Sequence, residues 1–260
     1  MQSETHDGRE TAYRQTEFGD GPGVLYIHGA GGTHQVWTHQ YTDTDTDGPT
    51  AAALDLSGHG DSDDVDVPAG PETLDAYADD VVAVCEATGA TVLCGNSMGG
   101  AIALWVALER DVTLDGLVLC DTGAKLAVAE AFSETLQADF DAAVELLHDP
   151  GTLFYDPADD LLELSKTGLR ETGQAVTIRD FETCDVFDVR DRLDEIDVPA
   201  LAIYGEHDPL TPPSYHEYLA EQLSACSLAE LEDAAHMPML ERPSAFNERV
   251  RSFVDSHCRP

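Results

Sequence analysis

A serine with a glycine two residues away on either side lies at the centre of the segment Gly95–Gly99. The apolar segment Thr91–Cys94 before it is rich in β-forming residues and predicts a buried strand. The segment Ala101–Leu108 after it predicts a helix, because it holds good helix formers without Gly or Pro. Strand, tight turn and helix around a serine form a nucleophile elbow. Such an elbow presents the Ser97 hydroxyl at the top of a sheet, beside the positive end of the helix.

The residue types that activate such a serine follow two later strands. Asp208 comes after the predicted strand Ala200–Tyr204, and His236 comes after the predicted strand Ser227–Leu231. Parallel strands end at the same side of a sheet, so we expect both side chains to converge on Ser97. In that arrangement His236 takes the serine proton near neutral pH, and Asp208 fixes the imidazole tautomer.

A second aspartate, Asp121, competes with Asp208 for this role. Asp121 follows the predicted strand Leu114–Cys120, next after the elbow, and topology alone does not choose between the two. Pro209 and Pro212 stiffen the chain beyond Asp208, which suits a side chain whose direction must be fixed. The sequence therefore favours Asp208, with Asp121 capping a turn.

A glycine-rich turn follows the predicted strand Val24–Ile27. Glycines after a strand leave backbone N–H groups free to point at a ligand. The turn alone fits a plain connection equally well. As part of an oxyanion hole, the N–H groups of Ala30 and Met98 would each contribute about 3 kcal/mol. His28, which opens the turn, is expected to hold the loop rather than to carry a proton.

Strand and helix patterns alternate along most of the chain, which predicts an α/β fold with a mostly parallel sheet covered by helices on both faces. Residues 127–197 break the alternation, because they have helical periodicity and no convincing strand. We therefore expect a core domain of residues 1–126 and 198–260, with residues 127–197 as a helical lid before the strand that bears Asp208. The lid aromatics are candidates for apolar substrate contacts: Phe132, Phe140, Phe154, Tyr155, Phe181 and Phe187.

From about residue 20 to residue 257 the chain resembles the α/β-hydrolase superfamily, in its lid-bearing esterase-like branch. The resemblance rests on five motifs: His28-Gly29-Ala30-Gly31, Gly58-His59-Gly60-Asp61-Ser62, Gly95-Asn96-Ser97-Met98-Gly99-Gly100, Gly205-Glu206-His207-Asp208 and His236-Met237-Pro238. It implies an α/β-hydrolase fold and a Ser97, Asp208 and His236 triad. The serine at the elbow argues against dehalogenases and epoxide hydrolases of this fold, which use aspartate there.

The resemblance implies a serine hydrolase that cleaves a small carboxylic ester, thioester or lactone through an acyl-serine intermediate, without a cofactor or metal. Hydrolases that cleave carbon–carbon bonds share the elbow pattern. They usually carry Gly-Pro-Gly after the first His-Gly and tryptophan after the catalytic histidine, where this chain has Gly31-Gly32-Thr33 and Met237. An acyltransferase or cofactor-free perhydrolase with the same triad stays compatible.

The charge is unusual: 51 acidic and 13 basic residues give a formal net charge of −38. Such a surface repels nucleic acid and anionic membranes, so neither is an expected partner. The acidic residues are spread along the whole chain, and concentrated salt would screen their repulsion. We therefore expect a halophilic origin. The oligomeric state is not predicted.

Six cysteines show no metal-binding spacing, and no signal segment or membrane-length apolar run is visible, so we expect a reduced, cytoplasmic protein. The alternating acidic loop Asp43-Thr44-Asp45-Thr46-Asp47-Gly48 matches the first half of a calcium-binding loop. Its twelfth position is Leu54 instead of the bidentate glutamate, which favours a solvated loop.

Overall fold

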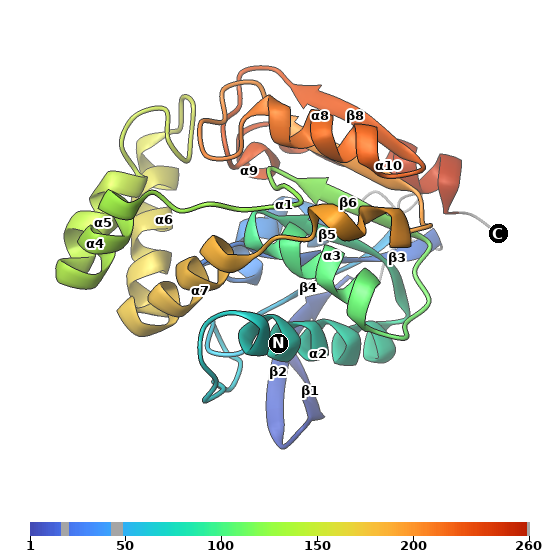
Figure 1. The fold of residues 1–260 in the computed structure, drawn as a ribbon, viewed down its shortest axis with the longest axis horizontal. Helices are drawn as coiled ribbons and strands as arrows, with labels where there is room; N and C mark the ends of the chain where they lie inside the picture. Colours follow the sequence, from blue (N-terminus) through green and yellow to red (C-terminus); the bar gives the residue numbers. More distant parts are fainter. Residues whose placement is uncertain (17–20, 43–48, 259–260) are drawn as a thin grey trace.

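Eight strands form one sheet through the middle of the protein in the computed structural model, which describes residues 1–16, 21–42 and 49–258 (Figure 1). The spatial order is β1-β2-β4-β3-β5-β6-β7-β8. β2 is antiparallel to both of its neighbours, and the pairs from β4 to β8 are parallel. The bounds are β1 Gln2–His6, β2 Arg9–Gln15, β3 Gly21–Ile27, β4 Pro49–Leu54, β5 Ala90–Asn96, β6 Gly116–Cys120, β7 Ala200–Gly205 and β8 Cys226–Leu231.

Helices cover both faces of the sheet, because alternate strand residues point to opposite sides. Leu25 and Leu93 pack into a core cluster with α2, α3 and α8, whereas Val24 and Val92 pack on the other face with η1, α9 and α10. The bounds are η1 His34–Trp37, α1 Thr38–Tyr41, α2 Pro71–Thr88, α3 Met98–Glu109, α8 Pro213–Gln222, α9 Pro238–Glu241 and α10 Pro243–His257. The chain thus has the two-faced α/β architecture that its alternating pattern predicts.

Four helices are inserted between β6 and β7 and form a group of their own at one side of the molecule (Figure 1). Their small core is built from Phe132, Leu136, Ala143, Val144, Leu147 and Leu169. The bounds are α4 Glu130–Ala138, α5 Phe140–Leu147, α6 Asp159–Thr172 and α7 Gln174–Val186, followed by η2 Arg190–Glu195. This helical insertion occupies the segment in which the sequence lacks strands.

The N-terminal region holds more strand than expected. The sequence indicates one edge strand at Ala12–Phe18, whereas the structure has the hairpin of β1 and β2, with β2 ending at Gln15. The turn residues Asp7 and Gly8 both have positive φ, at 47° and 81°. The acidic loop at residues 43–48 lies outside the described residues, so its cation-binding hypothesis is not addressed by the structure.

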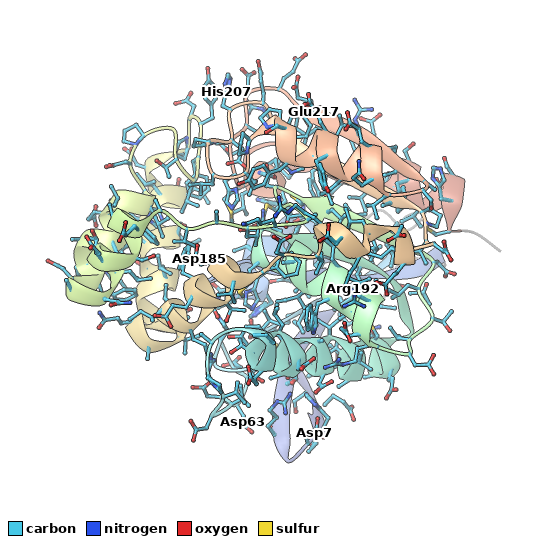
Figure 2. All side chains as sticks on the ribbon, viewed as in Figure 1. Asp7, Asp63, Asp185, Arg192, His207 and Glu217 are labelled. Atoms are coloured by element: carbon cyan, nitrogen blue, oxygen red, sulfur yellow. The ribbon has the colours of Figure 1, made fainter. Side chains whose placement is uncertain are left out.

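Exposed acidic side chains lie at opposite ends of the molecule. Asp7 and Asp63 are exposed at one end of the view in Figure 2, and Glu217 is exposed at the opposite end. Within the described ranges, no helix combines the length and the apolar character needed to cross a bilayer.

Candidate active site

The turn between β5 and α3 holds Ser97 in a left-handed backbone conformation, with φ at 56°. A Cβ at Gly95 would collide with the Gly99 backbone, and a Cβ at Gly99 would collide with the Ile27 carbonyl at the end of β3. Two hydrogen bonds fix the serine backbone from β6 and its following loop: the Ser97 N–H donates to the Cys120 carbonyl at 2.9 Å, and the Ser97 carbonyl accepts from the Thr122 hydroxyl. The elbow geometry predicted from the glycine spacing is therefore present.

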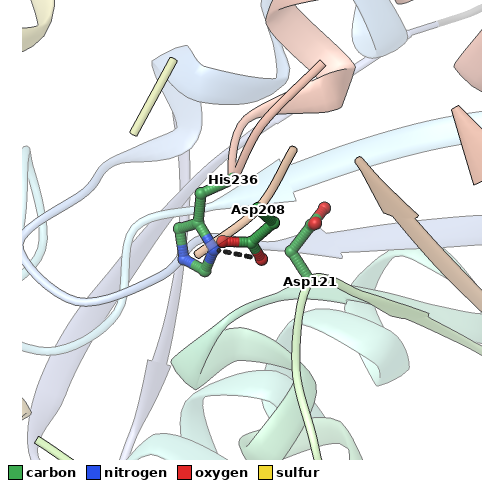
Figure 3. Close-up of side chains that lie close together, drawn as sticks. All are labelled: Asp121, Asp208 and His236. Carbon is green, nitrogen blue, oxygen red and sulfur yellow. Dashed lines mark hydrogen bonds and ion pairs between the residues drawn. The ribbon is translucent and has the colours of Figure 1, made fainter. Parts of the chain in front are cut away.

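His236 and Asp208 meet in the loops after β8 and β7 (Figure 3). His236 Nδ1 donates to Asp208 Oδ2 at 2.9 Å, since a carboxylate oxygen can only accept. The same carboxylate accepts from the Leu210 N–H at 2.8 Å and from the Thr211 N–H and hydroxyl. Burial raises the pKa of Asp208, but the His236 charge and these hydrogen bonds outweigh it and hold the pKa well below its ordinary value. Asp208 is therefore a charged carboxylate.

The loop that carries His236 is tied directly to the elbow. The Asn96 side chain, at the end of β5, donates to the His236 carbonyl at 3.1 Å. Ser97 and His236 line the same cavity. Ser97 and His236 therefore face one cavity, and His236 Nδ1 is engaged by Asp208.

Asp121 lies beside this pair (Figure 3), as its place after β6 predicts. It is fully buried, and its carboxyl group accepts from the Gly205 N–H at 2.9 Å and from the Cys120 thiol at 3.1 Å. Burial, together with the negative charge of Asp208, raises the pKa of Asp121 well above its ordinary value. The surroundings of Asp121 therefore favour its neutral, protonated form, whereas those of Asp208 favour the anion.

Asp121, Asp208 and His236 also form a possible metal-ligand group, with one ligand atom of each within 4.8 Å of the others. The oxygens of both carboxyl groups already accept N–H, O–H or S–H donors. These hydrogen bonds satisfy both buried carboxyl groups without an ion. The arrangement suits proton chemistry better than metal binding.

His28 holds the glycine-rich turn after β3. Its Nε2 accepts from the Leu56 N–H at 3.1 Å, so Nδ1 carries the proton and donates to the Gly29 carbonyl at 2.8 Å. The Gly32 N–H donates to the same oxygen at 3.1 Å. Burial lowers the pKa of His28 to about 4, which keeps the ring neutral. Because C=O and N–H point in opposite directions in a trans peptide, these bonds also fix the direction of the Ala30 N–H.

The helical insertion grips the same turn through Asp180, on α7. Asp180 is fully buried and accepts from the Gly31 N–H at 2.8 Å, from His59 Nε2 at 2.8 Å and from the Tyr77 hydroxyl at 2.7 Å. Burial raises the pKa of Asp180, but His59 outweighs it and the pKa is lowered; burial lowers the pKa of His59, but Asp180 outweighs it and the pKa is raised. The two form a buried ion pair.

Sequence reasoning missed this contact. His59 follows β4, where the sequence alone indicates an ordinary turn after a strand, and nothing in the periodicity of residues 174–186 singles out Asp180. The one available signal was an acidic residue in the middle of a helix that packs against the core, which is costly unless it is paired.

A cavity of about 410 Å³ opens between Ser97 and the helical insertion. Of the lid aromatics proposed from the sequence, Phe132 and Phe181 line it, with ring centroids 4.9 Å apart. The other four do not line it: Phe187 is part of the main core, Tyr155 stacks on His207, and Phe140 and Phe154 pack within the insertion. The expectation of substrate contacts is wrong for these four, because their side chains are used for packing.

Comparison with known proteins connects this geometry to a family. The sequence profile described as the alpha/beta hydrolase family matches residues 24–249. The chain belongs to this family. The match spans β3 through most of α10 and so includes every element that carries Ser97, Asp208 and His236.

Similar members of the alpha/beta hydrolase family include a pimeloyl-[acyl-carrier protein] methyl ester esterase of Neisseria meningitidis, 31% identical over 89% of this chain and 93% of that protein. A 3-oxoadipate enol-lactonase of Acinetobacter baylyi is 26% identical over 96% of each chain. Among solved structures, a thermophilic esterase is 30% identical with a TM-score of 0.86, covering 98% of this chain and 96% of that one. The relatives therefore act on ester bonds, in open-chain esters or in lactones.

Proposed function

We propose that this chain is a serine hydrolase that cleaves a small carboxylic ester or lactone through an acyl-Ser97 intermediate. The observation that carries the proposal is the hydrogen bond from His236 to the charged Asp208, in a loop tied to the elbow and facing the cavity that Ser97 lines. In this proposal Ser97 is the nucleophile, His236 the general base and Asp208 the residue that orients the imidazole. The esterase and lactonase relatives support the same bond type.

The reaction follows from these roles. His236 Nε2 takes the Ser97 proton as the oxygen attacks the ester carbonyl, and Asp208 stabilises the imidazolium that forms. The imidazolium then protonates the departing alkoxide, which leaves as an alcohol, or stays attached as a hydroxyl if the substrate is a lactone. A water molecule gives its proton to His236, attacks the acyl-serine and releases the acid, and His236 returns the proton to Ser97.

The Ala30 and Met98 N–H groups are the proposed oxyanion donors. Met98 is the first residue of α3, where an N–H has no partner within the helix. Ala30 lines the cavity, and the bonds to the Gly29 carbonyl aim its N–H. Donors that are fixed before the reaction stabilise developing charge without having to reorganise.

A covalent probe tests the proposal. A fluorophosphonate should label the wild-type protein at Ser97 and should spare Ser97→Ala, while Ser214→Ala, an exposed serine on α8, should label as the wild type does. Hydrolysis of acetate esters should disappear with Ser97→Ala alone. Labelling or hydrolysis that survives in Ser97→Ala would contradict the assignment.

An acyltransferase or perhydrolase would use the same residues, with an alcohol or peroxide in place of water at the second step. Product analysis in the presence of each nucleophile distinguishes them, and we expect the free acid to predominate. A ring-fission-type diketone distinguishes an ester hydrolase from a carbon–carbon bond hydrolase. We expect no reaction with this substrate.

We further propose that residues 127–197 act as a lid and that the protein works in a cytoplasm rich in salt. The cavity between the insertion and Ser97 supports the lid. The net charge of −38 supports a salt-rich environment, because concentrated salt screens the repulsion between acidic groups. The six free cysteines support a reducing compartment.

A further inference from the structure

The cavity offers an anionic substrate no cationic partner. None of the described residues that line it is Lys or Arg, whereas the exposed Asp149 is among them. The buried His148 also lines it, and burial lowers the pKa of His148, which keeps this ring neutral at neutral pH. A free carboxylate held inside would lose hydration without gaining a counter-charge, which is costly.

Lys166 on α6 directly follows the lining residue Ser165, but its ammonium group is engaged elsewhere. Its ammonium group lies 2.6 Å from a Glu145 oxygen and 3.7 Å from a Glu163 oxygen, and Lys166 does not line the cavity. Its charge is therefore already shared between two carboxylates outside the cavity.

The wall that the insertion gives to the cavity is leucine-rich, and besides Asp149 and Thr152 it contains one hydrogen-bonded polar pair. His148, just after α5, and Ser165, on α6, both line the cavity, and His148 Nε2 lies 2.9 Å from Ser165 Oγ. His148 Nδ1 lies 2.7 Å from the Val144 carbonyl, and a carbonyl can only accept, so Nδ1 carries the proton.

The hydrogen-bond directions follow from that tautomer. Nε2 of the neutral His148 ring is an acceptor, so Ser165 must donate its only proton to it. The Ser165 oxygen then has only lone pairs to offer a molecule in the cavity. It can accept a hydrogen bond from a hydroxyl or an amide N–H, and it has no proton left for a ketone, ether or carboxylate oxygen.

We propose that the cavity takes a neutral ester or lactone whose chain carries a hydroxyl or amide N–H group, and that Ser165, oriented by His148, binds that group. The inference rests on the proposed function, because it describes the substrate of the same site. It makes Ser165 a specificity-determining residue in the insertion, away from the bond that is cleaved.

Matched methyl esters test the donor preference. The set is octanoate, hydroxyoctanoates with the hydroxyl moved carbon by carbon along the chain, the corresponding methoxy ethers, and the ester of the dicarboxylic acid of equal length. At one hydroxyl position, kcat/KM should exceed that of octanoate about five- to tenfold, the worth of one net hydrogen bond. The methoxy ether should show no gain, and the carboxylate ester should fall roughly tenfold or more below octanoate.

Two variants on α6 place the preference at Ser165. In Ser165→Ala the ratio of the best hydroxyoctanoate to octanoate should fall to about one, since the acceptor is gone. Thr167→Ala is the matched control, because its hydroxyl bonds the Glu163 carbonyl and Thr167 does not line the cavity. Thr167→Ala should keep the wild-type ratio.

The outcomes separate this inference from the proposed function. Hydrolysis of octanoate that requires Ser97, but with no gain at any hydroxyl position or with a gain for the ether, overturns the Ser165 assignment alone. A carboxylate ester that reacts as fast as octanoate overturns the neutral-substrate class. No hydrolysis of any ester, acetate included, counts against the proposed function itself.

Discussion

Asp121 and Asp208 lie side by side at the ends of β6 and β7. Their surroundings favour different protonation states, the neutral acid for Asp121 and the anion for Asp208. Asp208 receives a charge-assisted bond from His236 and three further hydrogen bonds, from the Leu210 N–H and from the Thr211 N–H and hydroxyl, which favour the anion. Asp121 is buried next to that anion, and both conditions raise its pKa and favour the protonated form. The hydrogen-bond donors around each acid thus favour the charged form at Asp208, the carboxylate that hydrogen-bonds His236, and support our proposal that Asp208 is the acid of the triad.

Substitution of each acid by its neutral amide should separate their roles. Asp208→Asn should lower kcat by about 10⁴-fold, because the amide no longer stabilises the imidazolium. Asp121→Asn replaces one neutral group by another of the same shape and should change kcat by less than about threefold. Steady-state kinetics on an acetate ester measures both, with circular dichroism to verify folding. The reverse order would place the triad acid on the earlier strand.

The raised pKa of Asp121 also predicts a pH effect on stability. A group whose folded pKa lies above its unfolded value stabilises the fold below the unfolded value, here 3.8, and loses that contribution as pH rises towards the folded value. Asp121→Asn removes the titration. The free energy of unfolding of Asp121→Asn, minus that of the wild type, should therefore increase from acid towards neutral pH. Urea denaturation at several pH values measures this difference. A difference independent of pH would show that Asp121 is not perturbed.

These residues differ in how far the sequence could identify them. Ser97, Asp208 and His236 each follow a strand with a clear apolar pattern, so their convergence could be predicted from topology. Asp180 and Ser165 lie inside helices, where nothing local distinguishes a buried acid or a cavity-lining hydroxyl from a solvated one. Their roles depend on which helix face meets the core, and that is decided by packing between distant segments.

At the scale of elements, α7 anchors the helical insertion through Asp180, which accepts from the Gly31 N–H in the turn after β3 and forms an ion pair with His59 in the loop after β4. Asp180→Asn should lower the free energy of unfolding by about 3 kcal/mol, typical for breaking a buried pair, and should lower kcat more than it raises KM, because the turn positions Ala30. Glu182→Gln, an exposed neighbour on α7, is the control and should match wild type in both measurements.

The pH dependence of that variant gives a further check. The pKa of His59 is raised above 6.5, so its contribution to stability is full below that value and is lost as pH rises through the folded pKa. The pKa of Asp180 is lowered, so its contribution is lost only in strong acid. The stability difference between wild type and Asp180→Asn should shrink above the folded pKa of His59. A constant difference into alkaline pH would show that the ion pair is not what holds the turn.

The insertion should also set the acyl-chain preference. Phe181→Ala enlarges the cavity and should move the optimum to longer chains, with single methylene steps worth about tenfold, while turnover of an acetate ester changes little. Phe140→Ala, which packs within the insertion without lining the cavity, is the control. Equal losses on all esters in Phe181→Ala would indicate a packing role.

Helices and strands could be predicted from the sequence where the apolar pattern agrees with the residues that typically begin and end such elements. α2 begins with Pro71 and ends at Gly89 with φ at 72°, and its apolar spacing is regular. β1 was missed because its five residues, Gln2–His6, are polar and mostly exposed, with pairing to β2 as their main support. An edge strand of that kind is stabilised by its neighbour, which a local pattern does not record.

At the scale of the whole molecule, the acidic surface should make stability depend on salt. The net charge of −38 is distributed over opposite ends of the structure, so self-repulsion acts across the entire fold (Figure 2). The thermal midpoint should rise steadily from low salt to molar potassium chloride as the repulsion is screened. Scanning calorimetry over this range measures it, and a midpoint that is flat or falls with salt would contradict a halophilic setting.

The bond from the Asn96 side chain to the His236 carbonyl joins residues 140 positions apart. After the nucleophile elbow has been synthesised, the ribosome must still add more than half of the chain before β8 and the His236 loop can pack against the elbow. In the proposed mechanism the serine has no general base until then, so it does not react with acyl compounds in the surrounding solution. In this mechanism, hydrolytic activity appears only late in the synthesis of each chain. A chain truncated before His236 has no hydrolytic activity.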